Sequence, residues 1–166
     1  MVELVLLCLP TIVYLVVQSR GQDRRSRFRA ALARAGVSWG SPSGYGWALL
    51  VLLLMMLTAW LPLALIPADV QGTSGMSLAR LTSVGTAIGI ALRAIGEEVF
   101  FRGLLGGVLM RRLGFGWGNL LQAAIFLVPH VPLLLLNVRL WPLLPAQFAA
   151  GWMMGWLRHK TDTFVP

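Results

Sequence analysis

Residues 93–105 read RAIGEEVFFRGLL, and this stretch decides the fold because it sets four ionisable side chains inside a very apolar region. Arg93 lies four residues before Glu97, and Arg102 lies four residues after Glu98. Residues four apart share a face of a helix, so the spacing predicts the ion pairs Arg93–Glu97 and Glu98–Arg102. The two adjacent glutamates point about 100° apart on a helix. One of them can therefore be held in an ion pair while the other faces different surroundings.

The composition indicates an integral membrane protein. Of the 166 residues, 57% are hydrophobic and 12% are charged, whereas soluble domains carry about 25% charged residues. An ionisable group at the centre of a bilayer costs about 2.5–3.5 kcal/mol on insertion scales. The charged side chains of residues 93–102 are therefore expected to pair inside a helix bundle or to line a water-filled cavity. We predict an all-α, multi-pass transmembrane helical bundle in the cell membrane.

Charge and cysteine content limit the partners. The net charge of +8 lies mostly beside apolar spans, where basic residues set the orientation and contact anionic lipid. We therefore expect the lipid bilayer, and no nucleic acid, as a partner. The single cysteine, Cys8, excludes an intramolecular disulfide and a cysteine-based metal site.

About five spans are predicted, with the N-terminus outside. They cover residues 2–17, 47–66, 78–110, 119–136 and 141–157. Residues 1–18 then form the first transmembrane span, residues 19–46 a basic cytoplasmic segment, and residues 47–166 the transmembrane core. With this arrangement most basic residues fall on one side, as the positive-inside rule requires.

The segments between the spans are read from composition. Residues 20–34 hold six arginines and one acid; they form either a basic amphipathic helix on the membrane surface or a loop that enforces the orientation, and the loop is the favoured interpretation. Residues 36–46 and 69–77 are rich in Gly, Ser and other turn formers and are predicted loops.

Small and polar residues add detail to the later spans. The span at residues 78–110 is long enough to be tilted or broken, and Gly96 is the candidate position for a break. Asn119 is a candidate N-cap of the following span. Glycine pairs four residues apart predict close helix packing; they are Gly85 with Gly89, Gly103 with Gly107, and Gly151 with Gly155.

The reactive groups inside the spans are few. Carboxylates together with the imidazole of His130 could activate a water molecule, since a carboxylate can take the proton and an imidazole can orient the water or stabilise an oxyanion. Glu98, paired with Arg102, would have the structural role, and Glu97 would be the base, although Arg93 leaves that assignment open. Three other readings remain: His130 as a hydrogen-bond partner between helices, the Glu–Arg pair as a structural clamp, or the same pair as part of an ion path.

At these residues the chain resembles a known family. The motif EExxFRG matches residues 97–103, and FxxxH on the next span matches Phe126 to His130. Both motifs are similar to those of the CPBP intramembrane proteases, which include the type II CAAX prenyl endopeptidases and the bacteriocin-processing or self-immunity proteins, lysostaphin-resistance-A-like proteins among them. The resemblance covers roughly residue 80 to residue 166.

The resemblance implies an intramembrane endopeptidase whose substrate is a peptide or a prenylated protein. Glu97, helped by His130, would activate the hydrolytic water, and Glu98 with Arg102 would hold the site together. Phe101 and Phe126 are the expected substrate-binding residues. The family has been described both as metal-dependent and as a metal-free glutamate type. Zinc held by His130 and Glu97 is possible, but catalytic zinc usually has three protein ligands.

One departure from the family pattern concerns the last motif. The family carries a further His, followed four residues later by Asn or Asp, on a later helix. Residues 151–166, GWMMGWLRHKTDTFVP, look like the segment just before that motif, so the core is expected to be truncated there. The alternative functions are a non-catalytic membrane scaffold or self-immunity protein of the same family, and a transporter or channel fragment.

Overall fold

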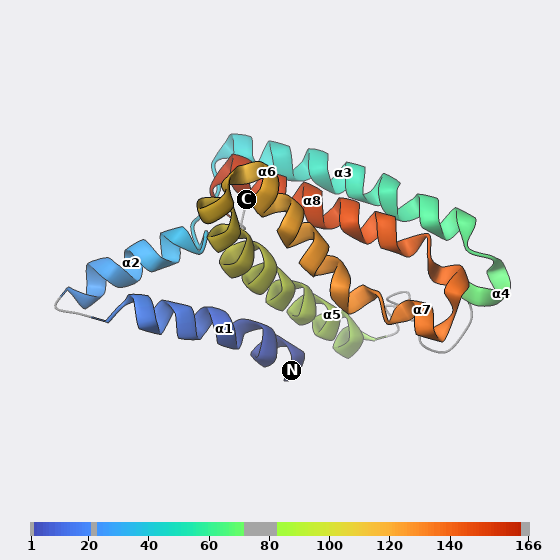
Figure 1. Ribbon diagram of the computed structural model, residues 1–166, viewed down its shortest axis with the longest axis horizontal. Coiled ribbons are helices and arrows are strands. Elements are labelled where there is room, and N and C mark those ends of the chain that lie inside the picture. Colours follow the sequence, from blue (N-terminus) through green and yellow to red (C-terminus); the bar gives the residue numbers. More distant parts are fainter. Residues whose placement is uncertain (1, 21–22, 72–82, 164–166) are drawn as a thin grey trace.

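The computed structural model of the protein describes residues 2–20, 23–71 and 83–163, and within these ranges every regular element is a helix (Figure 1). The elements are α1 (Val2–Gln18), α2 (Arg24–Arg34), α3 (Pro42–Leu65), α4 (Ala68–Gln71), α5 (Val84–Glu97), the π-helix η1 (Glu98–Gly106), α6 (Gly107–Leu127), the 3-10 helix η2 (Val128–His130), α7 (Leu133–Leu136), the 3-10 helix η3 (Val138–Leu140) and α8 (Leu143–Thr161). The all-α prediction is confirmed for the described residues.

Two segments that were predicted as loops are partly helical. Residues 24–34 form α2, so the loop interpretation of that stretch is wrong; the segment is made largely of Arg, Ala and Leu, which are strong helix formers. The helix α3 begins at Pro42, inside the stretch read as a loop. Its start is fixed by Ser41, whose hydroxyl accepts a hydrogen bond from the Gly44 amide at 3.1 Å, and by the proline at the first helical position.

The far end of α3 is closed by the short helix α4. Two carbonyls at the end of α3, those of Leu63 and Ile66, each accept a hydrogen bond at 2.8 Å from the side-chain amide of Gln71. Residues 69–71 are therefore helical rather than loop, while the rest of the predicted loop, residues 72–77, lies outside the described residues, as does Arg80.

The helical segment Val84–Leu136 folds back on itself. Its 53 residues would be about 80 Å long as one straight helix at 1.5 Å per residue, far more than the roughly 30 Å of a bilayer core. Gly114 has a φ of 76°, which only glycine adopts easily, and it turns the chain. A Cβ at Gly118 would lie 2.5 Å from Met110 Cα, so the return is tight. The expected break near Gly96 is wrong.

Asn119 does not cap a helix. It lies inside α6 and is fully buried, and its side-chain amide donates to the Trp152 carbonyl of α8 at 3.1 Å. The helix continues through this position because Gly114, five residues earlier, already provides the turn between the two predicted spans. The polar side chain is used between helices instead of at a helix end.

The helix α8 packs between α6 and α3, and the three run side by side (Figure 1). The glycines of α8 face α6: a Cβ at Gly151 would lie 3.0 Å from the Phe126 ring, and one at Gly155 would overlap the Asn119 amide. The close packing predicted for this pair is therefore confirmed. For the pair Gly85 and Gly89, a Cβ at Gly89 would meet nothing within 4 Å in the described part of the chain, and one at Gly85 would meet only the hydroxyl of Ser83, the N-cap of the same helix, at 3.7 Å.

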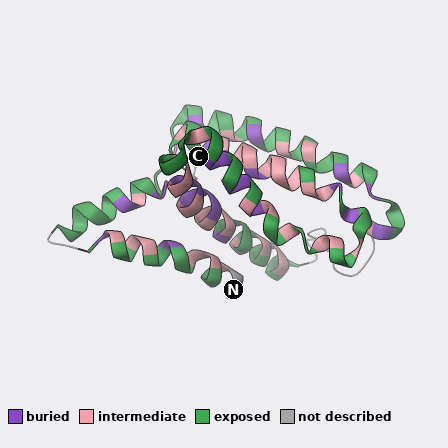
Figure 2. Ribbon diagram, viewed as in Figure 1, coloured by how far each residue is buried: buried purple, intermediate pink, exposed green. Residues whose placement is uncertain are grey.

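Large apolar side chains cover the outside of the molecule. Most of α3 is exposed (Figure 2), including Leu49, Leu53 and Leu57. By length and composition, two helical segments could cross a membrane, Pro42–Leu65 and Val84–Leu136. Exposed apolar surface of this extent is typical of contact with lipid rather than water, and it indicates a membrane protein.

Candidate active site

The two glutamates lie where the α-helix α5 passes into the π-helix η1. Short π-helical stretches inside α-helices are rare and frequently occur at functional sites. Nε of Arg93 donates to Oε1 of Glu97 at 3.0 Å, and Nη1 of Arg102 lies 3.3 Å from Oε1 of Glu98. Both predicted ion pairs are confirmed. The pairs differ in surroundings, because the Arg93 side chain is 57% exposed and that of Arg102 only 3%.

Arg102 connects the two sequence motifs. Its Cζ lies 4.2 Å from the centroid of the Phe126 ring, a cation–π contact. The Phe101 ring meets the same Phe126 ring edge to face, with the centroids 5.1 Å apart. The EExxFRG and FxxxH motifs therefore touch through one arginine and two phenylalanines, so the residues expected to bind substrate form the packing between η1 and α6.

His130 sits in the 3-10 helix that follows α6. The helix α6 ends at Leu127 because Pro129 and Pro132 remove backbone donors. Nδ1 of His130 lies 3.0 Å from the Phe126 carbonyl. A carbonyl only accepts hydrogen bonds, so Nδ1 carries the proton, and in the neutral ring Nε2 keeps its lone pair. The His130 and Phe126 rings are 5.1 Å apart between centroids.

The structure does not join the imidazole directly to the carboxylates. Among the described residues, no hydrogen bond or ion pair links His130 to Glu97 or Glu98. The connection runs from Glu98 to Arg102 and across the Phe126 ring to His130. Oε2 of Glu98 is buried and has no hydrogen-bond partner in the described part of the chain. A water molecule or a substrate amide could occupy that position.

The donor set for a metal is small. Within residues 2–20, 23–71 and 83–163, no group of three His, Cys, Asp or Glu side chains lies close enough to hold a metal ion. Glu97 and His130 would supply two ligands, fewer than the three protein ligands typical of catalytic zinc. The described residues do not fit a zinc ion, and no step below depends on one.

The first helix supports the site in a way that the sequence did not reveal. Oγ1 of Thr11 in α1 donates to the Val99 carbonyl of η1 at 3.3 Å. A Cβ at Gly96 would lie 3.3 Å from Leu7, so the absence of a side chain there lets α1 approach the glutamate-bearing helix. A single threonine in an apolar span does not predict this contact. Gly96 carries a usable signal, because a glycine in a membrane helix indicates close packing as well as a break.

Comparison with known proteins agrees with both motifs. A family model described as Type II CAAX prenyl endopeptidase Rce1-like matches residues 79–166. The matched range is more than half of the chain and contains η1, α6, η2 and α8. No curated protein and no solved structure matches the chain.

Proposed function

We propose that the protein is an intramembrane endopeptidase, because the chain belongs to the Rce1-like family of type II CAAX prenyl endopeptidases. Membership confirms the resemblance drawn from EExxFRG and FxxxH. The substrate would be a peptide or a prenylated protein, and the bond would be cleaved in or near the bilayer. We propose further that the protein spans the cell membrane several times, with its N-terminus outside.

The observation that carries the proposal is the contact between the two motifs. Arg102 pairs with Glu98 at 3.3 Å and stacks on Phe126 at 4.2 Å, and Phe126 is the first residue of the motif that ends at His130. Two motifs that are 24 residues apart in sequence, Arg102 to Phe126, thus meet on neighbouring helices. A structural clamp would need the Glu98–Arg102 pair alone, but not the stacking of Arg102 on a residue of the second motif.

In the proposed mechanism Glu97 takes a proton from water as the water oxygen attacks the carbonyl carbon of the scissile bond. His130 orients the water or stabilises the oxyanion that forms. The carbon–nitrogen bond then breaks, and the proton held by Glu97 passes to the departing amine. Glu98 and Arg102 position the helix that carries Glu97, and the buried rings of Phe101 and Phe126 hold η1 against α6 beside the site.

The test compares Glu97→Gln and His130→Ala with the unchanged protein. Membranes containing each variant are given a set of membrane-anchored peptides, with and without a prenylated C-terminal cysteine. Loss of a general base lowers a rate by about 10²–10⁴-fold, so both variants should lose cleavage. Asp69→Asn and His159→Ala, which neutralise another acidic side chain and remove the other histidine at positions outside the two motifs, should keep it.

Folding is checked separately, by thermal unfolding of each purified variant in detergent. If Glu97→Gln and His130→Ala fold normally and still cleave, the assigned roles are wrong. If the unchanged protein cleaves none of the peptides, the non-catalytic scaffold becomes the better account of this chain.

A further inference from the structure

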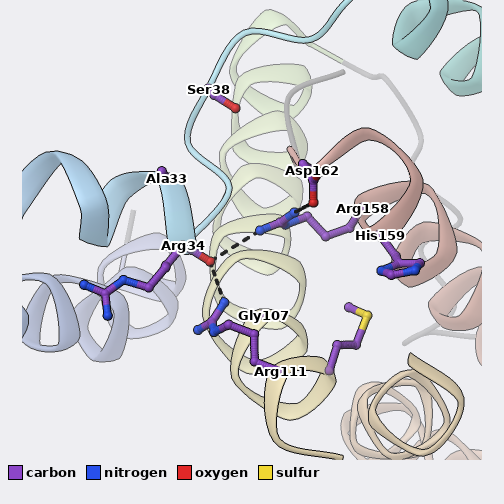
Figure 3. Close-up of a pocket in the computed structure, with 9 residues that line it drawn as sticks. Ala33, Arg34, Ser38, Gly107, Arg111, Arg158, His159 and Asp162 are labelled. Carbon is purple, nitrogen blue, oxygen red and sulfur yellow. Dashed lines mark hydrogen bonds and ion pairs between the residues drawn. The ribbon is translucent and has the colours of Figure 1, made fainter. Parts of the chain in front are cut away.

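A basic hollow of about 550 Å³ opens at one end of the bundle, where Arg34, Arg111 and Arg158 lie close together (Figure 3). It lies between the C-terminal end of α2, the first turns of α6 and the last turns of α8. Its lining consists of Ala33, Arg34, Ser38, Gly107, Met110, Arg111, Arg158, His159 and Asp162. The residues come from three parts of the chain that are far apart in sequence, so the hollow depends on the fold.

Two guanidinium groups converge in the basic hollow on one backbone oxygen. Nη1 of Arg111 donates to the Arg34 carbonyl at 2.8 Å, and Nη2 of Arg158 donates to the same oxygen at 3.3 Å. The dashed lines in Figure 3 mark both contacts. Gly107 makes the first possible, since a Cβ there would lie 3.0 Å from Nη1 of Arg111 and 3.1 Å from the Arg34 oxygen.

Closing the end of α2 accounts for only part of this arrangement. Arg34 is the last residue of α2, and terminal carbonyls of a helix need partners. Each arginine, however, gives one N–H to that carbonyl, and a guanidinium has five N–H donors. One cation would be sufficient for the carbonyl, and two like charges brought to one oxygen repel each other.

The acid available in the basic hollow neutralises little of this charge. Asp162 is the acidic side chain of the lining, and its side chain is 99% exposed and 4.0 Å from Nη1 of Arg158. An ion pair so open to solvent contributes little to stability. Arg158 itself is only 8% exposed, and its Nε has no hydrogen-bond partner among the described residues. A buried cation with unused donors is stabilised by an anion.

We infer that the basic hollow binds the phosphate group of an anionic ligand. Arginine forks match the geometry of phosphate oxygens and donate two parallel hydrogen bonds. The volume exceeds that of a bare phosphate and leaves room for a headgroup. The ring of His159, stacked on Phe115 with centroids 4.5 Å apart, adds an imidazole to the lining. Basic pockets between membrane helices bind phospholipid headgroups in this way, and a free phosphate offers the same chemistry.

The experiment uses the full chain purified in a neutral detergent. Its unfolding midpoint is measured with inorganic phosphate, with phosphatidylglycerol, and with zwitterionic phosphatidylcholine, because a ligand that binds the folded state raises the midpoint. Arg111→Gln removes one exposed guanidinium of the basic hollow and should weaken binding of the anion by about tenfold or more. The matched control is Arg112→Gln, which removes the same charge from the adjacent exposed residue outside the lining.

If phosphatidylglycerol alone raises the unfolding midpoint, the ligand is a lipid headgroup. If inorganic phosphate raises it as well, the phosphate group itself is sufficient for binding. Either result supports the inference when Arg111→Gln reduces the rise in midpoint and Arg112→Gln does not. Arg158→Gln should abolish binding. Because Arg158 is buried, this variant can also lose stability, so the conclusion rests on Arg111→Gln. The inference is overturned if neither anion raises the midpoint above that with phosphatidylcholine, or if the two exposed-arginine variants lose binding equally.

Discussion

Arg102 is the side chain through which the two motifs of the candidate site touch. It is 2% exposed, it pairs with Glu98, and its guanidinium covers the face of Phe126. Its Nε and Nη1 have no hydrogen-bond partner in the described part of the chain. The ion pair with Glu98 and the stacking on Phe126 therefore hold the buried guanidinium in place. Because Arg102 makes few hydrogen bonds, its position depends strongly on Glu98.

Replacing Arg102 should cost much more stability than replacing an exposed arginine. Arg102→Met leaves the Glu98 carboxylate without its cation, and breaking a buried pair costs about 3–5 kcal/mol. Chemical unfolding in detergent measures the loss. Glu98→Gln/Arg102→Met should lose less than the sum of the two single variants, because neighbours in one ion pair are not additive. Arg112→Met, the exposed control, should change the free energy of unfolding by no more than about 0.5 kcal/mol. If Arg102→Met loses no more stability than Arg112→Met, the Glu98–Arg102 pair does not act as a buried pair.

At the scale of residues the sequence predicted the ion pairs but not the stacking. Spacing along one helix is local, so Arg93–Glu97 and Glu98–Arg102 follow from helix geometry alone. The position of Arg102 over Phe126 depends on where the chain turns at Gly114, and that turn joins residues distant in sequence. The same limit applies to Thr11, whose partner Val99 is 88 residues away.

At the scale of elements, the seam between α6 and α8 holds the motif helices together. Gly151 faces Phe126 and Ala123, and Gly155 faces Asn119 and Gln122. Asn119 and Gln122 are fully buried. Close approach of two helices over glycine is a usual means of association in lipid, where no hydrophobic force drives helices together. The alignment of Phe126 in the site therefore depends on small residues of α8.

Adding one methyl group to this seam should separate the helices. In Gly155→Ala the new Cβ meets the Asn119 amide and lies 2.5 Å from Oε1 of Gln122. Overpacking of this kind costs about 1–3 kcal/mol, and the midpoint of thermal unfolding in detergent should fall. The matched control is Gly89→Ala, where the Cβ meets nothing within 4 Å; there the loss of chain entropy in the unfolded state should keep or raise stability by about 0.4–1 kcal/mol. Equal effects of the two variants would contradict the seam.

Element boundaries were the weaker part of the sequence interpretation, for physical reasons. Gly114 lies in RRLGFGWGN and Gly96 in RAIGEE, and composition does not show which of these glycines turns the chain and which lets a neighbouring helix pack closely. The π-helix η1 leaves no compositional mark at all. Residues 24–34 were read by charge as a loop, although their helix propensity is high. The all-helical character was predicted correctly, and the predicted span at residues 47–66 largely coincides with the apolar helix Pro42–Leu65, because about twenty apolar residues have few alternatives in a membrane. The number of spans stays a prediction.

At the scale of the whole molecule, the basic residues gather at one end of the bundle. Arg34, Arg111 and Arg158 line one hollow there. The opposite end carries the cluster of Ile66, Val70 and Leu140 where α3, α4 and η3 meet, together with the Arg139–Asp69 ion pair at 3.5 Å. The helices α3 and α8 run between these ends in opposite directions (Figure 1). Such a bias favours an orientation in which the basic end faces the cytoplasm.

Cysteine labelling tests that orientation. In a Cys8→Ser background, Ser26→Cys on α2 and Arg112→Cys on α6 report on the basic end, and Val138→Cys reports on the other; all three positions are exposed. An impermeant thiol reagent added to intact cells should label only Val138→Cys, and permeabilised cells should show all three labelled. The background protein without cysteine gives the blank, and the reverse pattern in intact cells would invert the topology. If the reagent labels Ser26→Cys but not Arg112→Cys in intact cells, α2 and α6 lie on opposite sides of the bilayer. That result would contradict the five-span arrangement. It would also contradict the basic hollow, because the 2.8 Å hydrogen bond between Arg111 and Arg34 requires the two helices to meet on one side of the membrane.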